Sequence, residues 1–223
     1  MKSVLISIQP KWCEKITRII GQKGSVPIYR KSEEIRKSKP KFETPFKCYI
    51  YCTAKDPLLW TGNVEDWGVV DARSNGKVIA EFICDNIQEY ESEFVDDDCF
   101  EMIASIDRDE DGDATGFFEW SNDSDIPYIS TDFYQKCCVP YEELKKYMGL
   151  GFATFYGWHI SDLVIYDKPK ELREFKTLCT KNTDCYLCDR YDHIRKYCNS
   201  TITRPPQSWC YVDHPTEKGG VQE

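Results

Sequence analysis

Short strand-like segments with a two-residue periodicity recur along this chain, and they restrict the folds that it can form. The first is VLISIQP at residues 4–10, and four more follow at residues 45–53, 67–85, 156–167 and 204–212. Alternating patterns of this length are typical of β-strands. Helical spacing occurs only after Pro10, in PYEELKKYMG at residues 140–149 and in one turn near KPKELREF. We therefore expect an α+β protein, built as a small mixed β-barrel with short flanking helices.

The third strand-like segment contains a specific turn signal. Asn75 and Gly76 form the dipeptide that favours a type I′ turn, because both central residues of that turn need a positive φ. We expect a single domain over residues 1–212. Within it we expect an acidic, irregular insertion at 86–136, in which the segment TGFFEW could form a short hairpin. We also expect a cysteine-rich excursion at 176–200 and a flexible tail at 213–223.

Charge is distributed unevenly along the sequence. The net charge is −9, but residues 1–55 hold thirteen basic and four acidic side chains, whereas residues 56–143 hold four basic and twenty-four acidic ones. A basic segment attracts phosphate or nucleic acid even in a protein that is acidic as a whole. The acidic middle is the segment expected to bind a host protein, if the chain acts as an interaction protein.

The sequence also indicates where in the cell the protein is located. No apolar run approaches the roughly 20 residues that a membrane span needs, and the first residues lack the pattern of a signal peptide. Twelve cysteines could indicate disulfides, but Cys48, Cys52 and Cys84 lie in apolar strand-like runs. Reduced, buried thiols fit that placement. We expect a cytoplasmic protein that makes no contact with a membrane.

A basic stretch at residues 29–41, YRKSEEIRKSKPK, carries the main candidate site. If the chain is extended near Glu34, then Glu34 and Arg36 share a face, and Lys31 can reach back toward them. Two cations beside one carboxylate can hold a phosphate, with Arg36 binding in a bidentate manner and Lys31 as a mobile charge. Lys37 adds a further cation. The alternative is a solvated, charged edge strand.

Several segments in order resemble the ASCH family of PUA-like β-barrels. They are RKSEEIRKSKPKFETPFKCYIYCT, GKVIAEFICD, GWHISDLVIYDKPKEL and ITRPPQSWCYV. The resemblance is closest to members found in phages and prophages of gut Firmicutes. The family motif Gly-x-Lys-x-x-Glu-x-Arg matches at Lys31, Glu34 and Arg36, whereas Tyr29 replaces the glycine, and TRIIGQKGSVPIY before the motif is extra.

This resemblance implies a barrel whose cleft carries the motif on its floor, and a role connected with RNA or modified nucleosides. Some relatives are amidohydrolases that act on acetylated cytidine, and others are proposed ribonucleases. In the amidohydrolase type, a lysine at the position of Lys31 acts with a threonine at the position of Glu34 and a downstream glutamate. A carboxylate replaces that hydroxyl here, so this mechanism does not carry over intact.

Other residues extend the candidate site, each with two interpretations. Glu81 alternates with two isoleucines, so it could be a desolvated proton shuttle with a raised pKa, or it could pair with a cation. His159 could be structural, or it could act in catalysis or base stacking. Tyr49 and Trp158 lie among cations in the strand segments, where they could stack RNA bases or belong to the core.

The cysteine-rich excursion is a candidate metal site. Cys179, Cys185, Cys188 and Cys198 have the spacing C-x5-C-x2-C-x9-C. Four thiolates of this kind can bind a structural zinc ion, but packed thiols are the alternative. Apart from this zinc, no cofactor is expected.

Three functions stay open at this point. The first is a module that binds RNA or a modified nucleotide through Lys31, Arg36, Lys37 and nearby aromatic or histidine side chains. The second is a hydrolase of the amidohydrolase or ribonuclease type, in which Lys31, Glu34 and Glu81 transfer protons. The third is a phage interaction protein that uses its acidic insertion. No P-loop, G-x-S-x-G or H-E-x-x-H motif is present in the sequence.

Overall fold

A computed structural model describes most of the chain in two compact units, which we treat separately. The residues described are 2–17, 31–56, 60–61, 72–94, 102–108, 110, 114–121, 133, 136–177, 191–192, 197–198 and 200–213. The first unit comprises Met1–Glu14, Phe46–Phe82 and Val164–Glu223, and the second comprises Lys15–Pro45 and Ile83–Leu163. The predicted α+β class is confirmed, because strands predominate beside two α-helices among these residues.

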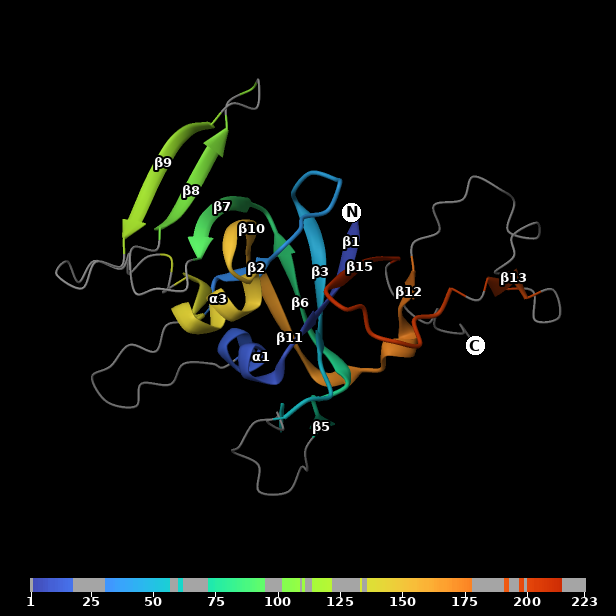
Figure 1. Ribbon diagram of the computed structural model, residues 1–223. Helices are drawn as coiled ribbons and strands as arrows, with labels where there is room; N and C mark the ends of the chain where they lie inside the picture. The colour runs from blue at the N-terminus through green and yellow to red at the C-terminus, as the bar shows by residue number, and fades with distance from the viewer. Residues whose placement is uncertain are drawn as a thin grey trace. The chain divides into compact units, whose positions relative to one another are not determined.

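A six-stranded sheet dominates the first unit (Figure 1). Its order is β11-β6-β3-β1-β15-β12. The strands are β1 (Ser3–Ile8), β3 (Phe46–Cys52), β6 (Lys77–Cys84), β11 (Ser161–Lys170), β12 (Lys176–Thr177) and β15 (Trp209–Asp213). β1 is parallel to β3 and antiparallel to β15. The order has two ends, so the described strands form an open sheet and no closed barrel.

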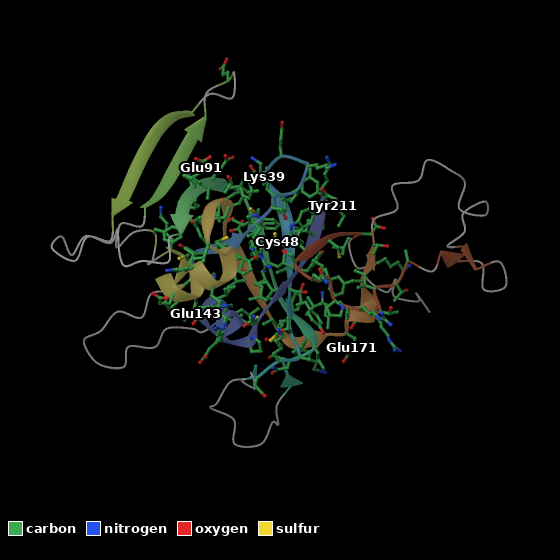
Figure 2. The ribbon with its side chains drawn as sticks, in the orientation of Figure 1. Lys39, Cys48, Glu91, Glu143, Glu171 and Tyr211 are labelled. Carbon is green, nitrogen blue, oxygen red and sulfur yellow. The ribbon has the colours of Figure 1, made fainter. Side chains whose placement is uncertain are left out.

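Both faces of the central strands are buried, which explains their apolar sequence. Val4, Leu5 and Ile6 of β1 are fully buried, and Tyr49 of β3 packs edge-on against Phe175 with ring centroids 5.0 Å apart. Cys48 lies in β3 (Figure 2). Together with Cys52 and Cys84, it is a buried free thiol, as the sequence predicted.

The second unit contains a five-stranded sheet, whose order is β2-β10-β7-β8-β9 (Figure 1). Its strands are β2 (Glu33–Arg36), β7 (Ile87–Phe94), β8 (Met102–Arg108), β9 (Ala114–Ser121) and β10 (Gly151–His159). Every neighbouring pair is antiparallel. Tyr90 stacks on Phe155 and meets Phe133 edge-on, so aromatic rings supply much of this unit's core.

The helices follow the sequence signals closely. α1 spans Pro10–Thr17 and buries Cys13 and Ile16, and α3 spans Tyr141–Met148 and ends at Gly149, whose φ is +91°. A positive φ favours glycine, so α3 stops there. The remaining elements are β4 (Trp60–Thr61), β5 (Ala72–Arg73), η1 (Leu172–Glu174), β13 (Tyr191–Asp192) and β14 (Tyr197–Cys198).

Three expectations about local structure are wrong. The segment 86–136 is not an irregular insertion, since it contains β7, β8 and β9, and β7 pairs with β10 along its whole length. The short hairpin expected around TGFFEW is present, because β9 pairs with β8 in an antiparallel manner. The strand expected at 156–167 is instead two strands, β10 and β11, separated at Ile160.

The third concerns the turn at Asn75-Gly76. Gly76 has a φ of +82° but Asn75 does not have a positive φ, so the turn is not type I′. The Asn75 side chain instead donates a 2.6 Å hydrogen bond to the carbonyl of Lys55, and β5 pairs with β4. This hydrogen bond gives the Asn75 side chain a partner, although the Asn75 backbone does not adopt the left-handed conformation.

Among the described residues, no helix has the length and hydrophobicity required to cross a bilayer.

Candidate functional site

Lys31, Glu34 and Arg36 form a buried ionic cluster in the second unit. Lys31 Nζ lies 2.9 Å from Glu34 Oε2, and Arg36 Nη2 lies 2.9 Å from Glu34 Oε1. The three residues are 2%, 5% and 5% exposed. The predicted convergence of these side chains is therefore present: Glu34 and Arg36 share one face of β2, and Lys31 reaches back to the same carboxylate.

Backbone hydrogen bonds fix the segment that presents Lys31. The Lys31 amide donates to the carbonyl of Lys15 at 3.1 Å, and the Ser32 amide donates to Lys136 at 2.8 Å. On the other side, the Ile160 amide donates to the Ser32 carbonyl at 2.8 Å. The ammonium group thus sits on a backbone that three separate segments hold in place.

Glu33, between these residues, belongs to the opposite face of β2. Its Oε2 accepts a 2.8 Å hydrogen bond from the Tyr90 hydroxyl, inside the aromatic core. A Cβ built on Gly157 would lie 2.4 Å from Glu33 Oε2 and 2.9 Å from Tyr90 Cε2. Gly157 therefore leaves the space in which this buried carboxylate meets its partner.

Two features that the sequence analysis missed adjoin the cluster. The Tyr147 hydroxyl of α3 accepts hydrogen bonds from the Arg36 side chain and the Lys37 backbone amide. Burial raises the pKa of this hydroxyl, although the two hydrogen bonds and the charge of Arg36 lower it. Lys37 Nζ lies 5.1 Å from the centroid of the Tyr147 ring. Only the folded chain brings α3 to β2, so no local signal in the sequence indicated Tyr147.

Lys39 and Tyr156 form the second missed feature. Lys39 Nζ lies 5.0 Å from the centroid of the Tyr156 ring and 3.6 Å from Glu89 Oε2. Tyr156 is the register partner of Arg36, and partners in a ladder share a face. Arg36, Tyr156 and Tyr147 therefore belong to the same side of the second sheet.

Cys137 is another neighbour of the cluster. Burial raises the pKa of its thiol to about 12, although the charge of Lys31 lowers it. The group is therefore a neutral thiol at pH 7, and a neutral thiol is a poor nucleophile. Within the described part of this neighbourhood, charge resides on the lysine, arginine and glutamate side chains.

Glu81 lies in the first unit and is held by two side chains. Lys47 Nζ is 2.6 Å from Oε1, and the Tyr166 hydroxyl donates to Oε2 at 2.5 Å. Burial raises the pKa of Glu81, but the hydrogen bonds from Lys47 and Tyr166 outweigh it and leave that pKa lowered. The interpretation of Glu81 as a carboxyl with a raised pKa is therefore wrong, and its pairing with a cation is confirmed.

Tyr49 and Trp158 are core residues. Tyr49 is 2% exposed and Trp158 is fully buried. A base stacks on the free face of a ring, and a buried ring offers none. The structure therefore supports the interpretation of Tyr49 and Trp158 as core residues and not as rings that stack on RNA bases.

His159 lies apart from the ionic cluster. It is the register partner of Glu33, so it belongs to the face of β2 and β10 opposite to Glu34 and Arg36. His159 Nδ1 lies 2.6 Å from Asp85 Oδ1, and both side chains are about half exposed. The hydrogen bond from His159 lowers the pKa of Asp85. The pair is ordered and accessible, but it does not extend the cationic site.

The predicted zinc ligands cannot be placed. Cys179, Cys185 and Cys188 lie outside the described residues, and Cys198 is described only as part of the backbone of β14. Among the residues that the structure does describe, no group of three or more metal-ligating side chains is present.

No family model, curated protein or solved structure significantly matches this chain. The likeness to the ASCH family stays a prediction from the sequence.

Proposed function

We propose that this protein binds RNA or a modified nucleotide, with Lys31 and Arg36 as phosphate ligands on a PUA-like barrel. The observation that carries the proposal is the cluster itself, in which two cations share one carboxylate, each at 2.9 Å. This arrangement has a net charge of +1. An anion that reaches it meets donors already oriented, in surroundings of low dielectric where a charge acts strongly.

Charge near the cluster also supports an anionic ligand. Lys37 and Lys39 follow Arg36 in sequence and are exposed, so they can meet a phosphate before the buried cations do. The first 55 residues as a whole have a net charge of +9. Lysines and arginines concentrated in this way are the usual electrostatic feature of a nucleic-acid-binding protein.

Glu34 bears on the choice between binding and hydrolysis. A general base needs a carboxylate oxygen that can accept a proton from the substrate. Both oxygens of Glu34 already face a cation, at Lys31 and at Arg36. Glu34 is thus better placed to orient the two cations than to take a proton, and hydrolysis by Lys31 and Glu34 is the second candidate.

The test is a gel-shift titration of single-stranded RNA at low salt. We expect Lys31→Met and Arg36→Met each to weaken binding by at least about tenfold, as loss of a charged hydrogen bond implies. Lys77→Met, at a partly exposed lysine of the first unit, is the matched control and should leave affinity unchanged. Circular dichroism must show that each variant is folded.

A parallel incubation separates the two candidates. The protein is mixed with N4-acetylcytidine and with short RNAs, and products are separated by chromatography. Unchanged substrates together with measurable RNA affinity support a binding module. Turnover that disappears in folded Lys31→Met and Glu34→Gln variants would make the hydrolase the correct function.

A further inference from the structure

Two partly exposed tyrosines, rather than the aromatic residues predicted from sequence, lie beside the cations of β2. Tyr147 is 43% exposed, and Tyr156 is partly buried. Tyr49 and Trp158, by contrast, are core residues. The candidate rings for base stacking are therefore Tyr147 of α3 and Tyr156 of β10.

Each of these tyrosines has a lysine over its ring. Lys37 Nζ is 5.1 Å from the ring centroid of Tyr147, and Lys39 Nζ is 5.0 Å from that of Tyr156. Arg36 connects the two, since it hydrogen bonds to the Tyr147 hydroxyl and is the register partner of Tyr156. We call Tyr147, Tyr156, Arg36, Lys37 and Lys39 the tyrosine–lysine surface.

We propose that the tyrosine–lysine surface binds a short single-stranded segment of RNA, whose bases stack on Tyr147 and Tyr156 while Lys37 and Lys39 bind the adjoining phosphates. This inference rests on the proposed function and specifies its ligand as unpaired RNA. Stacked bases on aromatic rings, beside cations that follow the backbone, are the usual chemistry of single-strand recognition.

The lysines explain how the surface can change on binding. Without ligand, each ammonium group lies over a ring face, where the attraction at an exposed site is weak, and Lys37 Nζ also donates a 3.3 Å hydrogen bond to the Met148 carbonyl. A lysine side chain is long and rotates freely, so the ammonium can move from the ring to a phosphate as a base takes its place. Glu89, 3.6 Å from Lys39, offers that lysine an alternative partner when RNA is absent.

The same sheet provides a matched control in Phe152. Phe152 of β10 is 85% exposed and shares its face with Tyr156, four residues later. No described cation lies over its ring, and the neighbouring register pair joins Thr154 to the exposed Glu91 (Figure 2). Phe152 therefore tests whether an exposed aromatic ring without a lysine over it would serve.

The experiment is a fluorescence-anisotropy titration with a labelled eight-nucleotide RNA, the same backbone without bases, and an RNA duplex. Tyr147→Leu and Tyr156→Leu remove a ring and keep an apolar side chain. We expect each to weaken binding of single-stranded RNA by about 5- to 150-fold, which corresponds to ~1–3 kcal/mol per stacked base. Phe152→Leu should stay within about twofold, and the abasic strand should show no effect of the tyrosine variants.

Each outcome has a defined meaning. Equal affinity of folded Tyr147→Leu, Tyr156→Leu and wild-type protein would overturn the inference, as would tighter binding of the duplex. If Lys31→Met still weakens binding by about tenfold or more in that case, the proposed function stands and only the tyrosine–lysine surface is wrong. Absence of RNA binding by the wild-type protein at low salt would reject both. A concentration-dependent dimer lost in Tyr147→Leu, with RNA affinity unchanged, would assign the surface to a second copy of the chain and overturn the inference.

Discussion

Glu34 Oε1 lies 2.9 Å from Arg36 Nη2, although both residues are only 5% exposed. Lys31 approaches the other oxygen of the same carboxylate. Removing Glu34 would leave two cations buried without their shared carboxylate, and an uncompensated buried charge is strongly destabilising. We therefore expect Glu34→Ala to lower the free energy of unfolding by about 3–5 kcal/mol in urea denaturation.

An apolar replacement of the whole cluster separates charge from packing. In the variant Lys31→Met, Glu34→Met and Arg36→Met, no buried charge remains at these positions, so we expect a smaller loss of stability than in Glu34→Ala. The triple variant should also fail to bind RNA. If the triple variant is less stable than Glu34→Ala, uncompensated buried charge is not the main reason that Glu34→Ala is destabilised.

Gly157 has the tightest surroundings of the second unit's glycines whose neighbours are described. Its added Cβ would meet Glu33 Oε2 and Tyr90 Cε2 at 2.4 and 2.9 Å, so a buried hydrogen-bonded pair must move. We expect Gly157→Ala to reduce the free energy of unfolding by about 1–3 kcal/mol, as overpacking does. Thr154→Ala, at an exposed position of the same strand, should change it by less than ~0.5 kcal/mol. Equal effects would show that the space at Gly157 is not limiting.

The sequence predicted the elements whose signals are local. Pro10 and Gly149 mark the start of α1 and the end of α3, and alternation located β1 and β3. The convergence of Lys31, Glu34 and Arg36 was also predictable, because a strand fixes which residues share a face. These features depend on spacing along the chain and not on distant contacts.

The rest depends on contacts between distant segments. Tyr147 meets Arg36 only because α3 packs near β2, and more than 100 residues separate them in sequence. Trp158 is an aromatic residue of a kind that can stack on bases, but it is fully buried in the fold, and its local sequence did not indicate this burial. The strands in segment 86–136 carry charge and few aliphatic residues, so their sequence gave little sign of a sheet.

Glu81 predicts a specific pH dependence. Folding lowers the pKa of this carboxyl group, so it stabilises the folded state above its unfolded pKa of about 4.3, and this stabilisation is lost as pH falls through the lower folded value. Glu81→Gln should therefore be less stable than wild type at pH 7, by about 1 kcal/mol given the partial exposure of the group. The difference should shrink below pH ~4. A difference that is constant from pH 7 to pH 3 in thermal unfolding would contradict this account.

The cysteine-rich segment predicts bound zinc. Protein purified without added metal should contain about one zinc ion per chain by elemental analysis, if Cys179, Cys185, Cys188 and Cys198 are its ligands. The double variant Cys185→Ser and Cys188→Ser should lose that metal. Cys48→Ser, at a buried cysteine of β3, should retain it. A folded, zinc-free wild-type protein would refute the site.

The dependence of RNA affinity on salt tests the central claim most directly, since each phosphate that a cation neutralises releases counterions. The logarithm of the binding constant for single-stranded RNA should fall linearly with the logarithm of salt concentration, by about 0.7 for each phosphate contact. For a folded Lys31→Met and Arg36→Met double variant, we predict a slope smaller in magnitude by about 1.4, since two contacts are lost. An unchanged slope, or no RNA binding by the wild-type protein at low salt, would contradict the assignment of Lys31 and Arg36 as phosphate ligands.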